Sequence, residues 1–342
     1  MSGDAVKPQQ EPQAAPVSRE AAVADWVKTK VLVEPGDRFK ITGAMRDQVT
    51  VVIPTLDEEE AIGPLIDEVK AAGYGKILVV DGYSKDRTVE IAKQKGAQVV
   101  GQHGKGKTGA LLVARDIVDT PYFILMDGDY SYDPKDIDRF VVHADGYDHI
   151  IGYRSKGNPN ISRVHRFGNW ILTKTFNFLM GSNIPDVACG MYLLRTQTAK
   201  QLIMDEQGLE VDHEIAAQIF MDGRMTYVPI SYRPRIGQTK VLTWRQGIRS
   251  WITVVSSARR HNPVVFFGFV VAIALIPAIA LLGYAGYLYL MLHSYHSGYF
   301  LGSLMLFVMG GQGLTLATIG YMLRRLERRL GSKIGTLKHS TP

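Results

Sequence analysis

Two aspartates, Asp127 and Asp129, flank a single glycine directly after the apolar run at 122–126. Because that run reads as a buried strand, both carboxylates should emerge together at its carboxyl end. Neighbouring anions repel each other and lose hydration there, so a compensating positive charge is expected. Carboxylate oxygens suit Mg²⁺ or Mn²⁺, ions that proteins commonly share with substrate phosphates. The alternative is a solvated Asp-Gly turn, and the rest of the chain decides between the two.

Segments that read as strands alternate with segments that read as helices around these aspartates. The strand-like segments are 51–53, 77–80, 97–100 and 122–126, and the helical ones are 61–72, 88–95, 108–118, 164–180 and 211–221. Repeated units of this length predict an α/β fold with a doubly wound, mostly parallel sheet. Ligands bind such sheets beyond the carboxyl ends of the strands. The polar loops that follow the strands should therefore converge on one site; they are 54–58, 81–86, 104–108 and 127–129.

Two apolar runs, about 264–292 and 299–323, predict a two-helix transmembrane hairpin within residues 263–323. No Asp, Glu, Lys or Arg occurs from 261 to 323, and each run exceeds the roughly 20 residues that a span needs. A buried hairpin in a soluble protein is the alternative. Arginines precede the first run and follow the second, while the connecting loop has none. The positive-inside rule therefore predicts an integral membrane protein whose large N-terminal portion lies in the cytosol.

The remaining segments complete the predicted organisation. Residues 241–260 place tryptophans and aliphatic residues at helical spacing, with arginines off that stripe, which predicts an amphipathic helix in the membrane interface rather than a core helix. The polar, Pro- and Gln-rich residues 1–20 read as a disordered tail without a signal peptide. Residues 21–47 form an extension that could hold a helix, residues 48–240 the catalytic domain, and residues 324–342 a basic cytosolic tail.

Charge and cysteine content narrow the classes of partner. The net charge of +6 owes much to arginines beside the apolar runs, so anionic lipid or phosphate-bearing substrates are the expected partners. The sequence has no recognisable nucleic-acid motif, and we expect no nucleic-acid partner. The single cysteine, Cys189, rules out an intrachain disulfide and agrees with a reducing compartment.

A competing motif lies at 101–108, GQHGKGKT, which satisfies the phosphate-loop pattern G-x-x-x-x-G-K-T. It follows a strand and opens a helix, as a nucleoside triphosphatase requires. However, it follows the third strand-like segment instead of the first, and only 20 residues separate Lys107 from Asp127. A membrane-anchored NTPase remains an alternative. In either case the lysines and exposed amides at this helix start should attract phosphate.

Five segments stand in colinear order at 51–59, 81–88, 127–129, 186–190 and 232–240. Together they resemble the inverting family-2 glycosyltransferases of GT-A fold, most closely those that make dolichyl-phosphate sugars. The segment 51–59, VVIPTLDEE, looks like the opening strand and loop of that family, and 81–88, DGYSKDRT, resembles its D-D-G-S-x-D-x-T. The D-G-D at 127–129 is similar to its metal-binding D-x-D. The segments 186–190, DVACG, and 232–240, YRPRIGQTK, stand where the family has D-x-x-S-G and Y-x-x-R-x-G-x-S-K.

The resemblance implies a metal-dependent enzyme that moves a sugar from a nucleotide-sugar to dolichyl or polyprenyl phosphate, with inversion to a β-linked product. Mg²⁺ or Mn²⁺ would be held by Asp127 and Asp129. The donor nucleotide-sugar would contact a set spread over the four loops, namely Pro54, Leu56, Glu58, Asp81, Ser84, Lys107, Asp127 and Gly128.

The acceptor phosphate already carries its charge, so the resemblance implies no general base. Arginine forks suit such a phosphate. The candidates, which join Asp127 and Asp129 as catalytic residues, are Arg154, Arg163, Arg166, Arg235 and Lys240.

The match departs from the family at a few positions. Gly82 replaces the usual second aspartate, and Ser131 stands where mannose-transferring relatives often have glutamine. These departures leave a non-catalytic lipid- or sugar-binding scaffold of the same fold as an alternative. UDP-N-acetylglucosamine, UDP-glucose and GDP-mannose all remain candidate donors, with a lean toward a UDP-sugar. The oligomeric state is unknown: the glycines at 310, 311 and 313 could pack a helix pair within one chain or between chains.

Overall fold

Seven strands form one mixed sheet at the centre of the N-terminal part of the chain, with the order β3-β2-β1-β4-β6-β5-β7. The structure is a computed structural model that describes residues 41–154, 160–204, 210–237, 244–294 and 296–339. The tail at 1–20 and residues 21–40 of the extension lie outside the described residues. The strands are β1 (Val49–Thr55), β2 (Ile77–Asp81), β3 (Gln98–Gly101), β4 (Tyr122–Leu125), β5 (His149–Arg154), β6 (Tyr192–Arg195) and β7 (Met225–Ile230).

The predicted α/β fold with a mostly parallel sheet is confirmed, and one strand departs from the parallel pattern. Strands β3, β2, β1 and β4 pair in parallel, and so do β5 and β7. Strand β6 runs antiparallel to both of its neighbours, β4 and β5. Its amino-terminal end therefore meets the carboxyl ends of the other six strands at one edge of the sheet.

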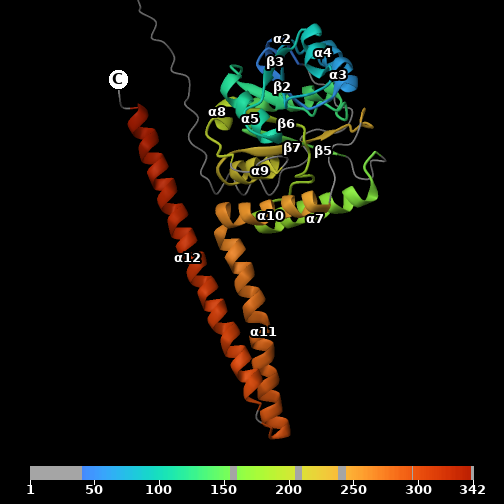
Figure 1. Ribbon diagram of the computed structural model, residues 1–342. Coiled ribbons are helices and arrows are strands. Elements are labelled where there is room, and N and C mark those ends of the chain that lie inside the picture. The colour runs from blue at the N-terminus through green and yellow to red at the C-terminus, as the bar shows by residue number, and fades with distance from the viewer. Residues whose placement is uncertain (1–40, 155–159, 205–209, 238–243, 295, 340–342) are drawn as a thin grey trace, which may run out of the picture.

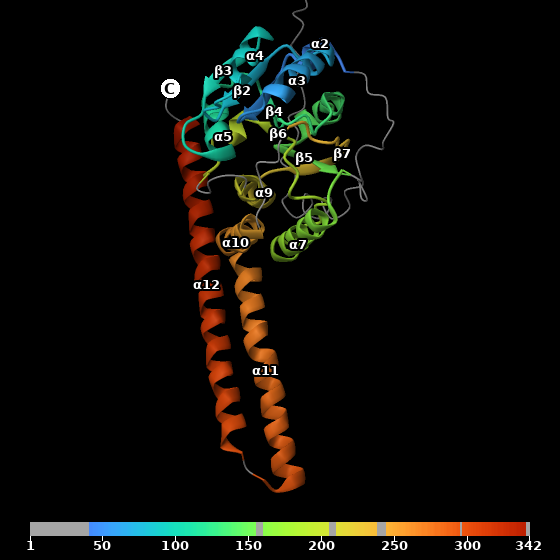
Figure 2. The same cartoon turned by 45° about the vertical axis from the view of Figure 1, so that its right-hand side comes forward.

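Helices cover the sheet and connect its strands. Those of the N-terminal part are α2 (Gly43–Arg46), α3 (Glu59–Ala71), α4 (Thr88–Gln94), α5 (Gly106–Ile117), α6 (Ile137–Val141), α7 (Arg163–Met180), α8 (Thr196–Ala199) and α9 (Val211–Asp222), with short 3₁₀ turns at Pro134–Asp136 and Ala144–Gly146. Helix α10 (Trp244–His261) lies beside α7, and both stand between the sheet and the C-terminal hairpin (Figures 1 and 2).

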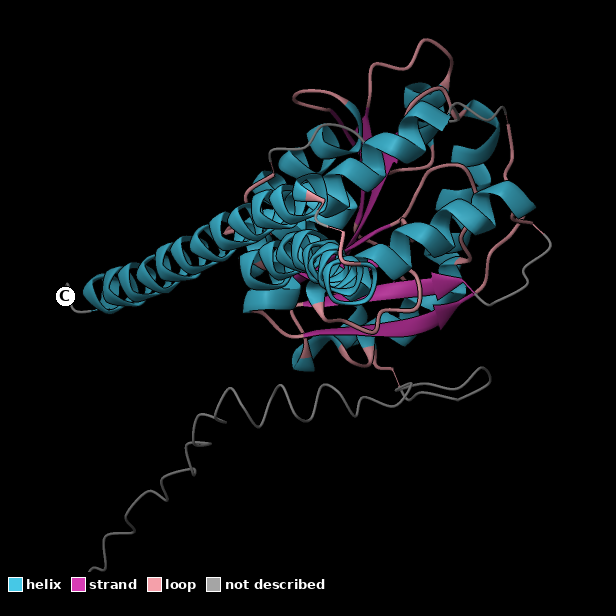
Figure 3. Ribbon diagram, turned by 90° about the horizontal axis from the view of Figure 1, so that it is seen from below, coloured by secondary structure: helices cyan, strands magenta, loops and turns pink. Residues whose placement is uncertain are grey.

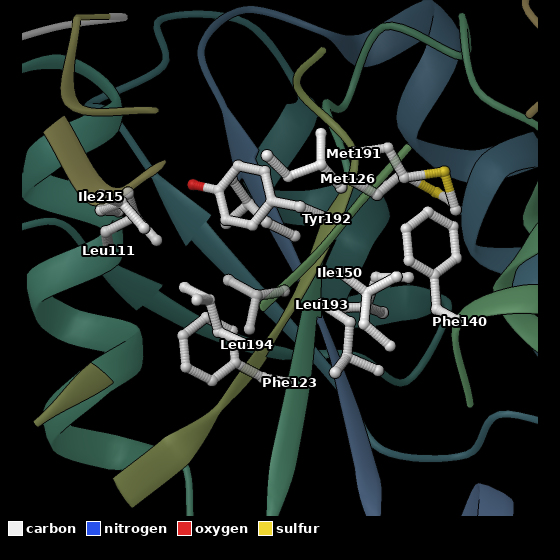
Figure 4. Packing of buried hydrophobic residues seen from close by; sticks show 14 of the residues in the cluster. Leu111, Phe123, Met126, Phe140, Ile150, Met191, Tyr192, Leu193, Leu194 and Ile215 are labelled. Carbon is white, nitrogen blue, oxygen red and sulfur yellow. The ribbon is translucent and has the colours of Figure 1, made fainter. Parts of the chain in front are cut away.

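The core forms because the central strands are apolar on both faces. The side chains of Phe123 and Leu125 in β4 and of Leu193 in β6 are fully buried, as expected for strands that have helices above and below. Figure 4 shows Phe123 beside Leu194 on one face of the sheet and Leu193 beside Ile150 on the other, with Leu111 and Ile215 close to each other on helices α5 and α9. This packing holds the edge of the sheet, and the loops on it, in a defined position.

The C-terminal hairpin consists of α11 (Pro263–Leu292), which runs away from the sheet, and α12 (Ser297–His339), which returns beside it (Figures 1 and 2). Figure 3 shows the same hairpin from below. The stretches Pro263–Leu292 and Ser297–Leu323 are long and apolar enough to cross a membrane, and little of either is covered by the rest of the chain. This agrees with the predicted spans. Helix α12 continues past Leu323 without a break, so the basic segment begins inside a helix.

Glycines on α12 let the two helices approach closely. A Cβ atom on Gly310 would lie 2.7 Å from a side-chain carbon of Leu275, and one on Gly313 would lie 2.8 Å from Val271. These two glycines therefore pack within the chain. Gly311 has no such neighbour among the described residues.

Candidate active site at the carboxyl edge of the sheet

The sheet topology brings six distant segments to one edge. The loops after β1, β2 and β4 start there because those strands are parallel. The antiparallel direction of β6 brings the preceding segment, with Asp186 and Gly190, to the same edge. The carboxyl ends of β5 and β7 add Arg154 and the segment that contains Arg235.

The glycine between the two aspartates is required by the neighbouring strand. A Cβ atom on Gly128 would lie 2.8 Å from a side-chain carbon of Thr55 and 3.1 Å from the carbonyl oxygen of Pro54. Only a residue without a side chain lets the chain pass β1 this closely. Gly128 thus directs Asp127 and Asp129 outward from the edge.

Lys107 connects Asp127 to a second acid from helix α9. Its ammonium group lies 3.3 Å from Asp127 and 2.8 Å from Asp212, and it donates to the carbonyl oxygen of Gly190 over 3.4 Å. The other oxygen of Asp212 accepts a 2.8 Å hydrogen bond from the hydroxyl of Tyr192. The lysine of the phosphate-loop pattern is therefore buried among carboxylates.

This arrangement shifts the pKa values of the charged groups. Burial raises the pKa of Asp127 to about 6, and the nearby charges of Asp129 and Asp212 add to the rise while Lys107 opposes it. Burial works against the charge of Lys107, but Asp127 and Asp212 outweigh it and hold the pKa of the lysine above its usual value. Lys107 therefore stays protonated beside a carboxyl group that titrates close to neutrality.

Arg235 connects the second aspartate to the loop after β1. Its guanidinium donates to Glu58 over 2.7 Å and lies 3.5 Å from Asp129. The hydroxyl of Ser131 donates to Asp129 over 2.5 Å. Glu58 and Arg235, which the sequence assigned to donor and acceptor respectively, thus contact each other.

The loops after β1 and β2 hold each other in place. The hydroxyl of Ser84 donates to Asp81 over 2.5 Å and accepts from the backbone N–H of Asp57 over 2.8 Å. Asp57 has a φ of 48°, and Tyr83 and Tyr130 each have a φ of 67°. These left-handed conformations are unfavourable for residues other than glycine, and backbone strain of this kind concentrates at functional sites. Leu56, also predicted to contact the donor, is partly exposed in the same loop.

The two aspartates suit a divalent ion that is shared with a ligand. They supply hard oxygen atoms on either side of one glycine, and the charge of Asp129 contributes to the raised pKa of Asp127. No group of three or more His, Cys, Asp or Glu side chains gathers around a metal-sized space in the part of the chain that the structure describes. Two carboxylates are the ligand set that Mg²⁺ or Mn²⁺ commonly takes from a protein before phosphate and water complete the coordination.

A cavity of about 660 Å³ extends from these acids to the helices beside the hairpin. Its wall at the sheet edge includes Lys107, Asp127, Arg154, Gly190 and Asp212. The opposite wall consists of residues of α7 and α10, among them Val164, His165, Asn169, Ile171, Leu172, Ile248 and Trp251. A mostly apolar passage thus leads from the D-G-D motif to the facing sides of α7 and α10.

The predicted phosphate-binding arginines separate into three groups. Arg154 lines the cavity, where it forms a two-pronged ion pair with Asp186 at 2.7 and 3.0 Å. Arg163 and Arg166 lie exposed on the first turn of α7 and do not line the cavity. Arg235 lies beside Glu58, and Lys240 is outside the described residues.

Sequence reasoning missed several residues that complete this site. Asp212 and Tyr192 are not among the residues that the sequence predicts for the site. Gly190 belonged to the 186–190 motif without a role, yet a Cβ atom there would collide with the carboxylate of Asp127. The backbone N–H of Gly190 donates a 2.8 Å hydrogen bond to the hydroxyl oxygen of the buried Tyr132. No local signal could have found these contacts, because each joins segments far apart in the chain.

Comparison with known proteins agrees with this geometry. Residues 50–203 match the model of the glycosyl transferase family 2. The chain is 28% identical over 299 residues to glycosyltransferase AglJ of Haloferax volcanii, a match that covers 85% of this chain and 99% of that protein. It is 34% identical over 201 residues to the dolichyl-phosphate hexose transferase of the same organism, covering 57% of this chain and 87% of that protein.

The fold also matches that of a solved enzyme. Glucosyl-3-phosphoglycerate synthase from Mycobacterium tuberculosis, in complex with Mn²⁺, UDP and phosphoglyceric acid, superposes with a TM-score of 0.55 at 17% identity, covering 65% of this chain and 84% of that one. The colinear motifs, the sheet edge that gathers them and these relatives lead to one conclusion: the chain belongs to glycosyl transferase family 2.

Proposed function

We propose that this glycosyltransferase moves a sugar from a nucleotide-sugar to a polyprenyl phosphate such as dolichyl phosphate. The cavity between Asp127 and helices α7 and α10 is the observation that carries this proposal. An acceptor with a phosphate head and an isoprenoid chain requires a polar end at the chemistry and an apolar path to the membrane. A water-soluble acceptor would require only the first of these.

The acids in the cavity favour a phosphate acceptor over a hydroxyl acceptor. A hydroxyl needs a general base, whereas a phosphate monoester already carries about −1.5 to −2 charges near neutral pH. Asp127 belongs to the metal-binding pair. Asp212, the other carboxylate in the described cavity wall, already accepts from Lys107 and Tyr192. Neither is free to remove a proton from the acceptor.

Arg154 is the residue best placed to bind the acceptor phosphate. Its ion pair with Asp186 uses Nε and Nη2, and Nη2 also donates to Ala188. Its Nη1 atom donates no hydrogen bond to a described residue. An arginine whose plane is already fixed loses little freedom when it binds a phosphate oxygen through its remaining donor. Arg163 and Arg166 would instead face the headgroups of the bilayer.

On the donor side, Asp81 and the residues around it would hold the nucleoside, with Pro54, Leu56, Glu58 and Ser84 in the neighbouring loops. A divalent metal held by Asp127 and Asp129 would neutralise the departing diphosphate. Lys107 would keep Asp127 ionised and add positive charge on the same side. A single displacement by the acceptor phosphate would invert the anomeric carbon and give a β-linked product.

The surface beside the cavity supports a membrane location. On α7, Phe167 and Trp170 are 62% and 56% exposed, and their rings stack with centroids 6.0 Å apart. On α10, Trp251 and Ile252 are also exposed. Both helices adjoin the start of α11, where Phe178 of α7 contacts Phe269. Such an apolar surface at the end of a spanning hairpin suits the membrane interface, and the arginine distribution favours the cytosolic face.

The relatives support the same reaction. One is named a dolichyl-phosphate hexose transferase, and another, from Rhizobium johnstonii, a dodecaprenyl-phosphate galacturonate synthase. The superposed enzyme binds UDP with Mn²⁺. UDP-N-acetylglucosamine, UDP-glucose and GDP-mannose are the donors to test for this chain. Because the chain belongs to family 2, the alternative that it is a membrane-anchored NTPase is not retained. The burial of Lys107 among carboxylates agrees with this.

The test is transfer of labelled sugar to lipid by the purified full-length protein. Each of the three donors is offered separately with dolichyl phosphate and Mg²⁺ or Mn²⁺. We expect label in the lipid phase from one donor, and none when dolichol replaces dolichyl phosphate. The Asp129→Asn variant should lose at least about 99% of this activity. The matched variant Asp116→Asn, at an exposed position outside the site, should keep it.

Two results would contradict the proposal. Equal transfer to dolichol would mean that the acceptor group is a hydroxyl. Binding of donor and lipid without transfer, unchanged by Asp129→Asn, would favour the non-catalytic scaffold.

A further inference from the structure

Helix α12 carries two seven-residue repeats on opposite faces, and only one of them has a partner. The first comprises small and apolar residues that face α11: Ser303, Leu306, Gly310, Gly313, Ala317 and Gly320, all buried or partly buried. The second alternates in steps of four and three residues: Leu301, Met305, Val308, Gln312, Thr315, Ile319 and Met322. All seven members of this outer seam are exposed.

A repeat of this kind is the pattern of a helix that packs against another helix along a straight line. The outer seam lies on the side of α12 away from α11, and no described part of the chain covers it. Apolar residues alone would need no cover there, because lipid is as apolar as they are. The feature that requires an explanation is the glutamine.

Gln312 lies deep within the predicted span. Its neighbour Gly313 packs against Val271, and Gly320 packs against Pro263 at the start of α11. Eight residues of helix separate Pro263 from Val271, which places Gln312 roughly 12 Å below the start of the hairpin. The side-chain amide makes no hydrogen bond within the described residues. The nearby Thr315 hydroxyl donates to the carbonyl oxygen of Gly311 over 3.1 Å, so it is satisfied without a neighbour.

An unpaired amide in hydrocarbon is unfavourable, because neither water nor lipid tails offer it a partner. We propose that the outer seam of α12 binds the same seam of a second copy of this chain, with Gln312 of each copy hydrogen-bonded to its counterpart. This inference rests on the part of the proposed function that places the hairpin across the bilayer. It does not depend on which sugar is transferred, or on whether transfer occurs.

The chemistry of the amide favours a second copy over other occupants. Two copies with the same orientation in the membrane are related by a two-fold axis along the membrane normal, so equivalent residues meet at the same depth. A glutamine carries both a donor and an acceptor, so two of them can satisfy each other. A polar residue at one core position of a seven-residue repeat is also a known means of setting register and the number of helices. The isoprenoid chain of the acceptor offers no such hydrogen bonds.

The experiment is disulfide cross-linking of the full-length protein in membranes at low protein-to-lipid ratio. Thr315→Cys places a thiol in the outer seam. Ile276→Cys places one on the lipid-exposed surface of α11 within the same span, because its neighbour Leu275 packs against Gly310. The native Cys189 is buried in the catalytic domain and does not compete. We expect a covalent dimer with Thr315→Cys and none with Ile276→Cys.

The role of the glutamine is tested by adding Gln312→Leu to Thr315→Cys. We expect the protein-to-lipid ratio at which half of the chains are dimeric to increase about 3- to 20-fold. This range corresponds to the measured strength of hydrogen bonds between helices in membranes. Gln312→Asn should restore part of the association. Val308→Leu, an apolar exchange in the same seam, should change it little. Leucine is compatible with lipid, so Gln312→Leu should fold, which a melting curve in detergent checks.

Several results would overturn the inference. These are a protein that stays monomeric at every ratio, a dimer unaffected by Gln312→Leu, and a Thr315→Cys product whose mass includes a different membrane protein. Release of the chain from membranes by alkaline carbonate would show that the hairpin does not span the bilayer. Gln312 would then not lie in hydrocarbon, and the inference would be overturned as well. A chain that dimerises as expected but transfers no sugar would sustain this inference while the proposed function fails.

Discussion

The ammonium group of Lys107 lies 3.3 Å from a carboxylate oxygen of Asp127. The lysine belongs to a glycine-rich segment that resembles a phosphate loop, yet its side chain is buried against the acids of the D-G-D motif and of α9. Its role follows from this position. It compensates the charge of Asp127 and Asp212, and it keeps both carboxylates at the wall of the cavity.

Replacing Lys107 should therefore lower the transfer activity, because Asp127 loses the cation that compensates its charge. Lys107→Met leaves two buried carboxylates without their cation, and breaking such a pair typically costs on the order of 3 kcal/mol. We expect transfer to fall about 10- to 100-fold and the melting temperature to drop. The control is Lys93→Met, which is exposed on α4 outside the site and should change neither. Similar transfer rates in the two variants would contradict the role assigned to Lys107.

Metal affinity should increase with pH around neutrality. The pKa of Asp127 is raised to about 6, above its usual value, mainly by burial. A divalent metal must displace that proton, so protonation competes with the metal below about pH 6. The affinity for Mn²⁺ alone should fall about tenfold from pH 7 to pH 5. An aspartate with an ordinary pKa would give almost no change over this range.

Electron paramagnetic resonance of free Mn²⁺ measures this affinity without substrate. The Asp127→Asn variant should bind weakly and lose the pH dependence. A pH-independent affinity in the unmodified protein would show that Asp127 does not titrate in this range.

Gly190 should tolerate no side chain. A Cβ atom there would collide with the carboxylate of Asp127 and lie 3.1 Å from the ammonium of Lys107. Gly190→Ala should therefore move these groups and reduce transfer about 10- to 100-fold, with weakened Mn²⁺ binding. The control is Gly146→Ala, where nothing lies within 4 Å of the added carbon. If Gly190→Ala bound Mn²⁺ and transferred sugar normally, the close packing of this turn would not matter for the site.

Replacing Arg154 should weaken the binding of the acceptor, whereas replacing Arg166 should not. Arg154 lines the cavity, whereas Arg166 is exposed on the first turn of α7. Arg154→Gln should raise the KM for dolichyl phosphate about tenfold or more while it changes the KM for the donor much less. Arg166→Gln should leave both within about twofold in neutral lipid.

Because Arg154 is also paired with Asp186, a melting curve must accompany these measurements. A selective loss of acceptor affinity in a stable Arg154→Gln protein supports the phosphate role. An acceptor KM that depends on Arg166 instead would move the phosphate to the outer face of α7.

Local patterns in the sequence were sufficient for much of the fold. The apolar runs before Asp81 and Asp127 predicted strands with polar loops at their carboxyl ends, because burial on both faces demands continuous apolar residues. The predicted hairpin spans agree with α11 and with the first part of α12 to within two residues at their starts, since hydropathy over 20 residues is a strong local signal. The colinear motifs identified the family before any contact was known.

The partners of those residues depended on tertiary structure. The contact of Lys107 with Asp212 joins residues 105 positions apart, and that of Gly190 with Asp127 requires β6 to run antiparallel to β4. Periodicity reports which face of a strand or helix is buried, but it carries no information about strand order or direction. The sequence by itself determined which elements form, which loops could bind phosphate and metal, and which helices could enter a membrane. Strand order and helix packing, which depend on contacts between distant segments, decided which side chains share the cavity.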